Sequence, residues 1–191
     1  MEIRCFDNKT VLLKGKKESV LINPTKGVLE ANKTQSRIIV FTSKNYDCLT
    51  LTEGEKVILR GPGEYEVGGV EILGVNAGNG DTVYVINVDG IIVGVLGSIT
   101  EVLSDKRIER INAVDVLLAP VGEKGTVSGK IVLSWAKKWG VNYLIPVGGE
   151  TDKEEMKKFL DEVDREDLQP VESLKVDSEN LPEGLEIVWI H

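Results

Sequence analysis

The chain has 191 residues, of which 41% are hydrophobic and 28% are charged. This composition is typical of a globular protein that buries a sizeable core, and it excludes a disordered chain. The 31 acidic and 23 basic side chains give a formal net charge of −8. Binding to nucleic acid or to an anionic membrane surface relies on clustered cations, so we expect neither partner.

The sequence also favours one cellular compartment. No stretch approaches the roughly 20 apolar residues that span a bilayer, and the first residues lack the cationic start and apolar centre of a signal peptide. We therefore expect a cytoplasmic protein in which Cys5 and Cys48 are reduced thiols. The one compact basic run, Lys14-Gly-Lys-Lys17, contains a glycine between apolar segments and predicts a solvated hairpin tip.

Short apolar or alternating runs predict a β-rich first half. Asn23-Pro24 ends the third of these runs, and Asp89-Gly90 is a strong signal for a type I′ hairpin turn. Antiparallel pairing is expected to dominate around this turn. The predicted strands comprise residues 3–6, 11–13, 19–23, 38–41, 57–59, 64–67, 69–73, 82–88 and 91–96.

Strands and helices alternate in the second half of the chain. This order implies parallel pairing with right-handed crossovers. Ser128 or Thr126 is expected to begin the first helix and Gly140 to end it, while Thr151 or Asp152 is expected to cap the second. The predicted helices comprise residues 128–139 and 152–163, and the predicted strands 114–118, 141–146 and 185–190.

The two halves together predict one domain over residues 1–191. A β-rich first half followed by a βαβα second half gives an α/β (α+β) protein with two sheets and helices outside them, a four-layer αββα sandwich. On this arrangement Trp135, Trp139 and Trp189 are expected to pack in the core or between helix and sheet, and His191 is expected to be exposed.

A buried strand that runs into a polar loop carries a family resemblance. The segment Arg37-Ile-Ile-Val-Phe-Thr-Ser-Lys-Asn-Tyr-Asp-Cys48 resembles the metal-binding segment of the metallo-β-lactamase fold, in which a strand and a Ser/Thr precede His-x-His-x-Asp-His. Only Asp47 of the family's ligands is retained. Ser43, Asn45 and Cys48 stand at the positions of the three histidines.

Further runs resemble the small lactonase-like branch of predicted zinc-dependent hydrolases in this superfamily. The most specific is Gly61-Pro-Gly-Glu-Tyr-Glu-Val-Gly-Gly69, and Val114-Asp-Val-Leu-Leu-Ala-Pro-Val-Gly122 is similar to a strand and loop of the branch. Leu96-Gly-Ser98 stands where the branch has Leu-Gly-Asp, and Gly148 stands where a strand ends in histidine. The branch's Gly-His-Ser and Asp-Pro are similarly altered, to Asp7-Asn-Lys9 and Asn23-Pro24.

The resemblance implies the αββα sandwich but not the family's chemistry. A catalytic zinc is usually held by three His, Cys or carboxylate ligands with a water completing the shell. Serine, asparagine and glycine at the ligand positions remove the strong donors, and the chain's one histidine is its last residue. We therefore expect no catalytic residue, and no zinc although the family implies it. A Mg²⁺ or Ca²⁺ ion held by Asp47 with hydroxyl, amide and backbone oxygens is the remaining metal alternative.

Asp47 and Cys48 also have structural interpretations. Cys48 lacks an internal histidine as its base, and a neighbouring carboxylate disfavours a thiolate, so we expect a small buried thiol. The Asp47 carboxylate is expected to accept backbone N–H bonds in a tight turn.

These observations lead to a functional hypothesis with two alternatives. We expect a catalytically silent protein that serves as a binding or assembly module for a small polar ligand or a protein partner. The first alternative is a metal-dependent hydrolase of lactones or phosphoesters with a rearranged site around Asp47 and Cys48. The second is a structural subunit of a homo-oligomer, which predicts a large apolar surface patch. The expected vestigial pocket is lined by Ser43, Asn45, Asp47, Cys48, Ser98 and Gly148.

Overall fold

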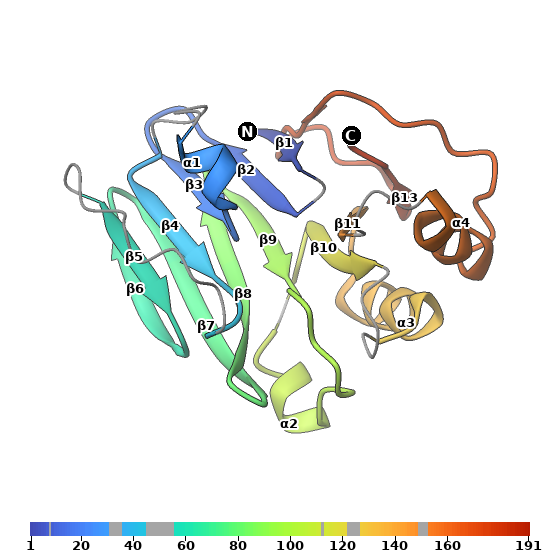
Figure 1. The fold of residues 1–191 in the computed structure, drawn as a ribbon, viewed down its shortest axis with the longest axis horizontal. Coiled ribbons are helices and arrows are strands. Elements are labelled where there is room, and N and C mark those ends of the chain that lie inside the picture. The colour runs from blue at the N-terminus through green and yellow to red at the C-terminus, as the bar shows by residue number, and fades with distance from the viewer. Residues whose placement is uncertain (8, 31–35, 45–55, 112, 122–126, 149–152) are drawn as a thin grey trace.

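The computed structural model describes the chain except for residues 8, 31–35, 45–55, 112, 122–126 and 149–152. Its strands form two mixed sheets that pack face to face (Figure 1). The first sheet contains, in spatial order, β12 (Leu174–Lys175), β1 (Glu2–Phe6), β2 (Thr10–Lys14), β3 (Ser19–Ile22), β4 (Ile38–Phe41) and β5 (Val57–Arg60). The second contains β13 (Glu186–Ile187), β11 (Tyr143–Gly148), β10 (Val116–Val121), β9 (Ile91–Val95), β8 (Asp81–Val88), β7 (Val70–Gly78) and β6 (Gly63–Val67).

Pairing changes direction within each sheet. In the first sheet the pairs β12–β1, β1–β2 and β2–β3 are antiparallel, whereas the pairs β3–β4 and β4–β5 are parallel. In the second sheet β6 to β9 form an antiparallel meander, and β9, β10, β11 and β13 are parallel. Asp89 and Gly90 join β8 to β9 with φ of 54° and 81°, which confirms the predicted type I′ turn.

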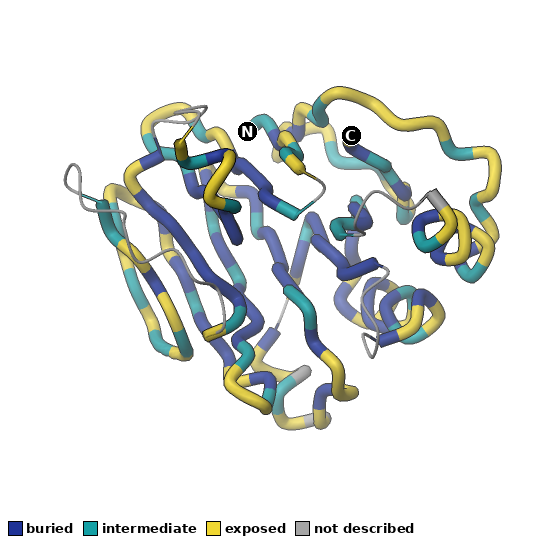
Figure 2. The backbone as a smooth tube through the Cα atoms, in the orientation of Figure 1, coloured by how far each residue is buried: buried dark blue, intermediate teal, exposed yellow. Residues whose placement is uncertain are grey.

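One apolar core lies between the two sheets and contains side chains from the inner faces of both. Figure 2 shows that the strands around it are buried along much of their length. Tyr84 on β8 is fully buried there, and its hydroxyl donates a hydrogen bond to the Gly61 carbonyl at 3.0 Å. Burial raises the pKa of the Tyr84 hydroxyl to about 12. Packing between the inner faces therefore sets the relative position of the two sheets, and with it which strand ends lie close together.

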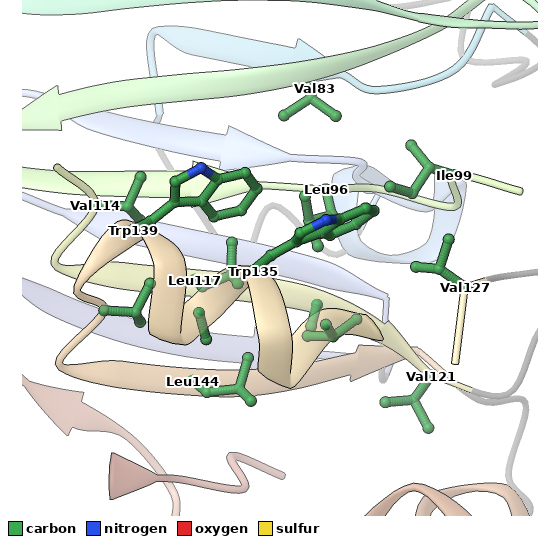
Figure 3. Packing of buried hydrophobic residues seen from close by; sticks show 14 of the residues in the cluster. Val83, Leu96, Ile99, Val114, Leu117, Val121, Val127, Trp135, Trp139 and Leu144 are labelled. Atoms are coloured by element: carbon green, nitrogen blue, oxygen red, sulfur yellow. The ribbon is translucent and has the colours of Figure 1, made fainter. Parts of the chain in front are cut away.

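Helices cover the outer faces. A second apolar cluster lies between the seven-stranded sheet and the helices α3 (Gly129–Trp139) and α4 (Lys153–Glu162), and in it Trp135 and Trp139 stack with ring centroids 5.8 Å apart (Figure 3). The short α2 (Asp105–Ile108) lies beyond β9. On the other sheet, Leu29 of α1 (Lys26–Glu30) packs with Leu21, Ile39 and Phe41. The layers confirm the predicted αββα sandwich.

Most predicted elements are present, and the differences have local causes. Strand β7 continues to Gly78, beyond the predicted end at residue 73, because β8 pairs with it over that whole length. The predicted strand 185–190 is reduced to β13, and β12, α1 and α2 were not predicted, since two to five residues carry no readable period.

Helix α3 begins and ends at the predicted residues, but a different side chain caps its first turn. Gly140 takes the left-handed conformation that terminates it, with φ of 67°. Ser128 occupies the N-cap position without a side-chain cap bond, and the Glu162 carboxylate on α4 accepts the Gly129 N–H at 2.7 Å instead. The other predicted cap residues, Thr126, Thr151 and Asp152, lie outside the described residues. Among the helices that the structure describes, none is long and apolar enough to cross a membrane.

Candidate ligand pocket at the strand ends

A small pocket forms where the carboxyl ends of several strands converge. Strands β9, β10 and β11 are parallel and end side by side, and β3 of the other sheet ends opposite them. Crevices at the carboxyl ends of parallel strands are common ligand sites. The pocket has a volume of about 30 Å³, room for one or two water-sized groups. Its lining residues are Lys9, Val11, Ile22, Asn23, Val95, Gly97, Ser98, Leu118, Ala119, Pro120, Val121, Val147 and Gly148.

The structure brings two of the predicted pocket residues together. Ser98 and Gly148 both line this pocket, whereas Ser43 is not among its lining residues. Ser43 instead pairs with Asp81 in an isolated antiparallel bridge beside the β7–β8 hairpin. The remaining predictions, Asn45, Asp47 and Cys48, lie outside the described residues, and so do the expected turn and buried thiol.

The backbone at Gly148 is packed against the neighbouring strand. Gly148 has φ of 125° and pairs with Val121 across the β10–β11 ladder. A Cβ atom on residue 148 would lie 2.6 Å from the Val121 carbonyl oxygen, well inside van der Waals contact. A histidine side chain therefore does not fit at this position without a shift of the backbone.

Gly97 is similarly enclosed. It has φ of 63°, and a Cβ atom there would collide with the Thr42 side chain. Thr42 is buried at the end of β4, and its backbone carbonyl accepts the Thr82 N–H at 2.7 Å. The close approach of Gly97 to Thr42 holds the loop after β9, which carries Ser98, against the first sheet.

A buried polar network forms the wall of the pocket on the side of β3. Asn23 takes a left-handed conformation with φ of 47°, which asparagine tolerates better than most residues. Its Oδ1 accepts the Thr42 N–H at 2.9 Å, and its Nδ2 donates to Thr42 Oγ1 at 2.9 Å. Thr10 Oγ1 donates to the Asn23 carbonyl at 3.2 Å. The Asn23 amide is thus occupied by structural hydrogen bonds.

Lys9 supplies the positive charge at the pocket. It follows the β1–β2 turn, where Asp7 has φ of 51° and the Lys9 N–H donates to the Phe6 carbonyl at 3.2 Å. The side chain is half-buried and lines the pocket with Ser98, whose hydroxyl has no hydrogen-bond partner within the described part of the chain. Lys9 and Asn23 were not predicted as pocket residues, although both belong to the altered anchors Asp7-Asn-Lys9 and Asn23-Pro24.

The described side chains of the pocket do not fit zinc. Within the described ranges, no three His, Cys, Asp or Glu side chains come together as a metal-ligand group. The polar groups that line the pocket are an ammonium, a hydroxyl and an amide whose atoms already bond to Thr42. An ammonium repels a cation, and neutral hydroxyl and amide oxygens are weak zinc donors.

Comparison with known proteins identifies the same fold. Residues 2–148 match the family model described as a beta-lactamase superfamily domain. A putative zinc-dependent hydrolase of the metallo-beta-lactamase superfamily from Thermotoga maritima is 24% identical, with a TM-score of 0.81, over 100% of this chain and 98% of that one.

Two further solved structures are similar. A putative metal-dependent hydrolase from Parabacteroides distasonis is 15% identical, with a TM-score of 0.63 over 99% of this chain and 93% of that chain. The metallo hydrolase Igni18 from Ignicoccus hospitalis is 14% identical, with a TM-score of 0.61 over 92% and 99%. At these identities the likeness shows the fold alone. A search of curated protein sequences gives no significant match.

Proposed function

The chain belongs to the family of beta-lactamase superfamily domains, and from that premise we propose that it is a catalytically silent member that acts as a binding or assembly module without zinc. The observation that carries the proposal is the packing of Gly148 against Val121. A lost ligand leaves an open position that a mutation could refill. Here the Val121 backbone occupies the space that a side chain at position 148 would need, so the fold uses this position for packing.

The contact between Gly97 and Thr42 supports the same proposal. In the resemblance, the residue after Gly97 delivers the bridging carboxylate, and this chain has Ser98 there. Because Gly97 lies against Thr42, the loop is held by contacts among the protein's own side chains. The arrangement does not require a metal ion to bring these segments together.

The pocket suits a small polar ligand. Lys9 contributes a cation and Ser98 a hydroxyl that can donate or accept a hydrogen bond, while Val95, Leu118 and Val147 form apolar walls. A volume of about 30 Å³ accommodates a small group or the end of a larger molecule. The structural-subunit alternative has less support, because the large apolar side chains exposed on the described surface, Ile58, Val102 and Val171, belong to three separate segments.

Metal content tests the proposal against the hydrolase alternative. Tag-free protein would be incubated with zinc or manganese, desalted and subjected to elemental analysis, beside the variants Asp47→Ala and Cys48→Ala. We expect far less than one metal ion per chain in all three proteins. About one zinc per chain in the wild type, lost in both variants, would overturn the proposal and favour a hydrolase with a rearranged site.

A further inference from the structure

A second, larger hollow lies at the opposite end of the strands. It has a volume of about 550 Å³, within the range of small-molecule sites. Strands β2 and β9 each reach both hollows: Val11 and Val95 line the pocket described above, and Lys14 and Ile91 line this one. The five residues of β9 separate the two by about 13 Å. The lining residues are Met1, Glu2, Lys14, Gly15, Lys16, Asp89, Ile91, Lys175, Val176, Asp177 and Ser178.

Three lysines from two distant segments surround this hollow, which we call the lysine groove. Lys14 and Lys16 belong to the β2–β3 hairpin tip, and Lys175 ends β12. In the sheet register Glu2 on β1 lies between Lys14 and Lys175, which places all three side chains on one face. The three lysines are exposed, and within the described residues none of their ammonium groups forms an ion pair.

Three carboxylates also line the groove, and other groups donate hydrogen bonds to each of them. Glu2 Oε1 accepts hydrogen bonds from Arg4 at 2.8 and 3.0 Å, which lower the pKa of the Glu2 carboxyl. Asp89 Oδ2 accepts the Lys16 N–H at 2.7 Å. Asp177 accepts hydrogen bonds from Asn180 Nδ2 at 2.9 Å and from the Glu179 N–H at 3.2 Å.

The groove is also firmly built. Val176 extends the β1–β12 ladder, since its N–H donates to the Met1 carbonyl at 2.9 Å. Val176 and Ile91 are buried in the inter-sheet core and also line the groove. The Asp89 carboxylate fixes the basic hairpin tip against the β8–β9 turn. Lysines that converge from separate, anchored segments over a concave surface present several ammonium groups to one ligand.

We propose that the lysine groove binds a small polyanion that carries two or more phosphate or carboxylate groups. Lys14 and Lys175 hold it from the two sides of Glu2, and Lys16 contacts it from the hairpin tip. The lining carries four cationic groups, the three lysines and the Met1 ammonium, against the carboxylates of Glu2, Asp89 and Asp177. The groove is independent of the pocket at the other end of β9, so its ligand and the absence of zinc are separate questions.

The test is an NMR titration of the full-length chain labelled with ¹⁵N, at low salt, with pyrophosphate and with citrate as probes. We expect saturable shifts of the Gly15, Lys16 and Val176 amide resonances, with a Kd below about 1 mM. Tighter binding of pyrophosphate identifies phosphate as the preferred group, and tighter binding of citrate identifies carboxylate.

Paired variants separate a site from general charge attraction. Lys14→Gln with Lys175→Gln should weaken binding about tenfold or more. Lys130→Gln with Lys137→Gln removes the same charge from two exposed lysines of α3 and should leave Kd unchanged. Lys16→Gln alone, which leaves the strands intact, should weaken binding by a smaller factor. Absence of shifts at about 10 mM probe, or equal weakening in the α3 variant, would overturn the proposal.

Discussion

The two ends of strand β9 differ in how many of their polar groups are held in structural contacts. At the carboxyl end, Gly148 and Gly97 are enclosed by neighbouring atoms, and the Asn23 amide is bonded to Thr42. At the amino end, the backbone is equally anchored, but three lysine side chains remain exposed over a hollow. A family resemblance directs attention to the first end, where Lys9 is half-buried, whereas three exposed lysines lie at the second. Conserved fold and available chemistry need not coincide in one place.

The largest expected effect tests whether the carboxyl end is closed. Gly148→Ala should lower the free energy of unfolding by about 3 kcal/mol, because a left-handed backbone and a clash with the Val121 carbonyl act together. Gly69→Ala is the matched control: it has φ of 87° but nothing within 4 Å of the new Cβ, so about 1 kcal/mol is expected. Urea denaturation measures both. Equal losses would show that position 148 is open to a side chain.

The structure at each end of β9 could be predicted from the sequence only where the residues involved are close together in the chain. Strands such as β4 and β9 were predicted well because continuous or alternating apolar runs indicate a buried strand. Ser98 and Gly148 were assigned to a vestigial pocket by resemblance, and in the structure both lie at the small pocket formed by the strand ends. Lys9 was missed because its approach to Ser98 depends on how the β1–β2 turn lies over the other sheet, which no local pattern encodes.

The lysine groove shows the same limit more sharply. The run Lys14-Gly-Lys-Lys17 was correctly predicted as a hairpin tip. Lys175 lies on a two-residue strand far along the chain, and its place beside Glu2 follows only from the ladder register. The enclosure of Gly148 likewise cannot be predicted from the sequence. A glycine that merely replaces a metal-binding histidine cannot be distinguished there from a glycine that packing requires.

The second prediction examines the polar network that closes the pocket. Asn23→Ala should lower the free energy of unfolding by about 2 kcal/mol more than Asn79→Ala, because it leaves the buried Thr42 N–H without its acceptor. Asn79 is a suitable control, since it has φ of 51° and an exposed hydrogen bond to Glu101. Thermal and urea denaturation report the difference. If the two variants match, the network contributes little and this end is held by apolar packing alone.

A third prediction examines the same kind of interaction at the amino end. Asp89→Ala removes an exposed carboxylate that accepts the Lys16 N–H, and about 1 kcal/mol is expected because water can replace the lost acceptor. Asp89→Asn keeps an acceptor oxygen and tolerates the φ of 54°, so it should be close to wild type. A loss as large as that of Asn23→Ala would remove the contrast between a buried and an exposed network.

The smallest effect concerns Cys5, which lies on β1 between the two ends and packs partly against the inter-sheet core. Burial raises the pKa of its thiol from 9.0 to about 12. The folded state then holds a proton that the unfolded state releases, so the thiol's contribution is complete below pH 9 and is lost as the pH rises toward 12.

At pH 9 the expected loss in the free energy of unfolding is only about 0.4 kcal/mol relative to pH 7. The Tyr84 hydroxyl, whose pKa is raised from 10.0, contributes a smaller loss at that pH. The measurement compares urea denaturation of the Cys48→Ala protein with that of the Cys5→Ala, Cys48→Ala protein at both pH values. The first protein should lose stability and the second should lose less, by that amount. Identical pH profiles would mean that the Cys5 thiol ionises as freely in the folded chain as in the unfolded one, and that β1 is more open to solvent than its packing indicates.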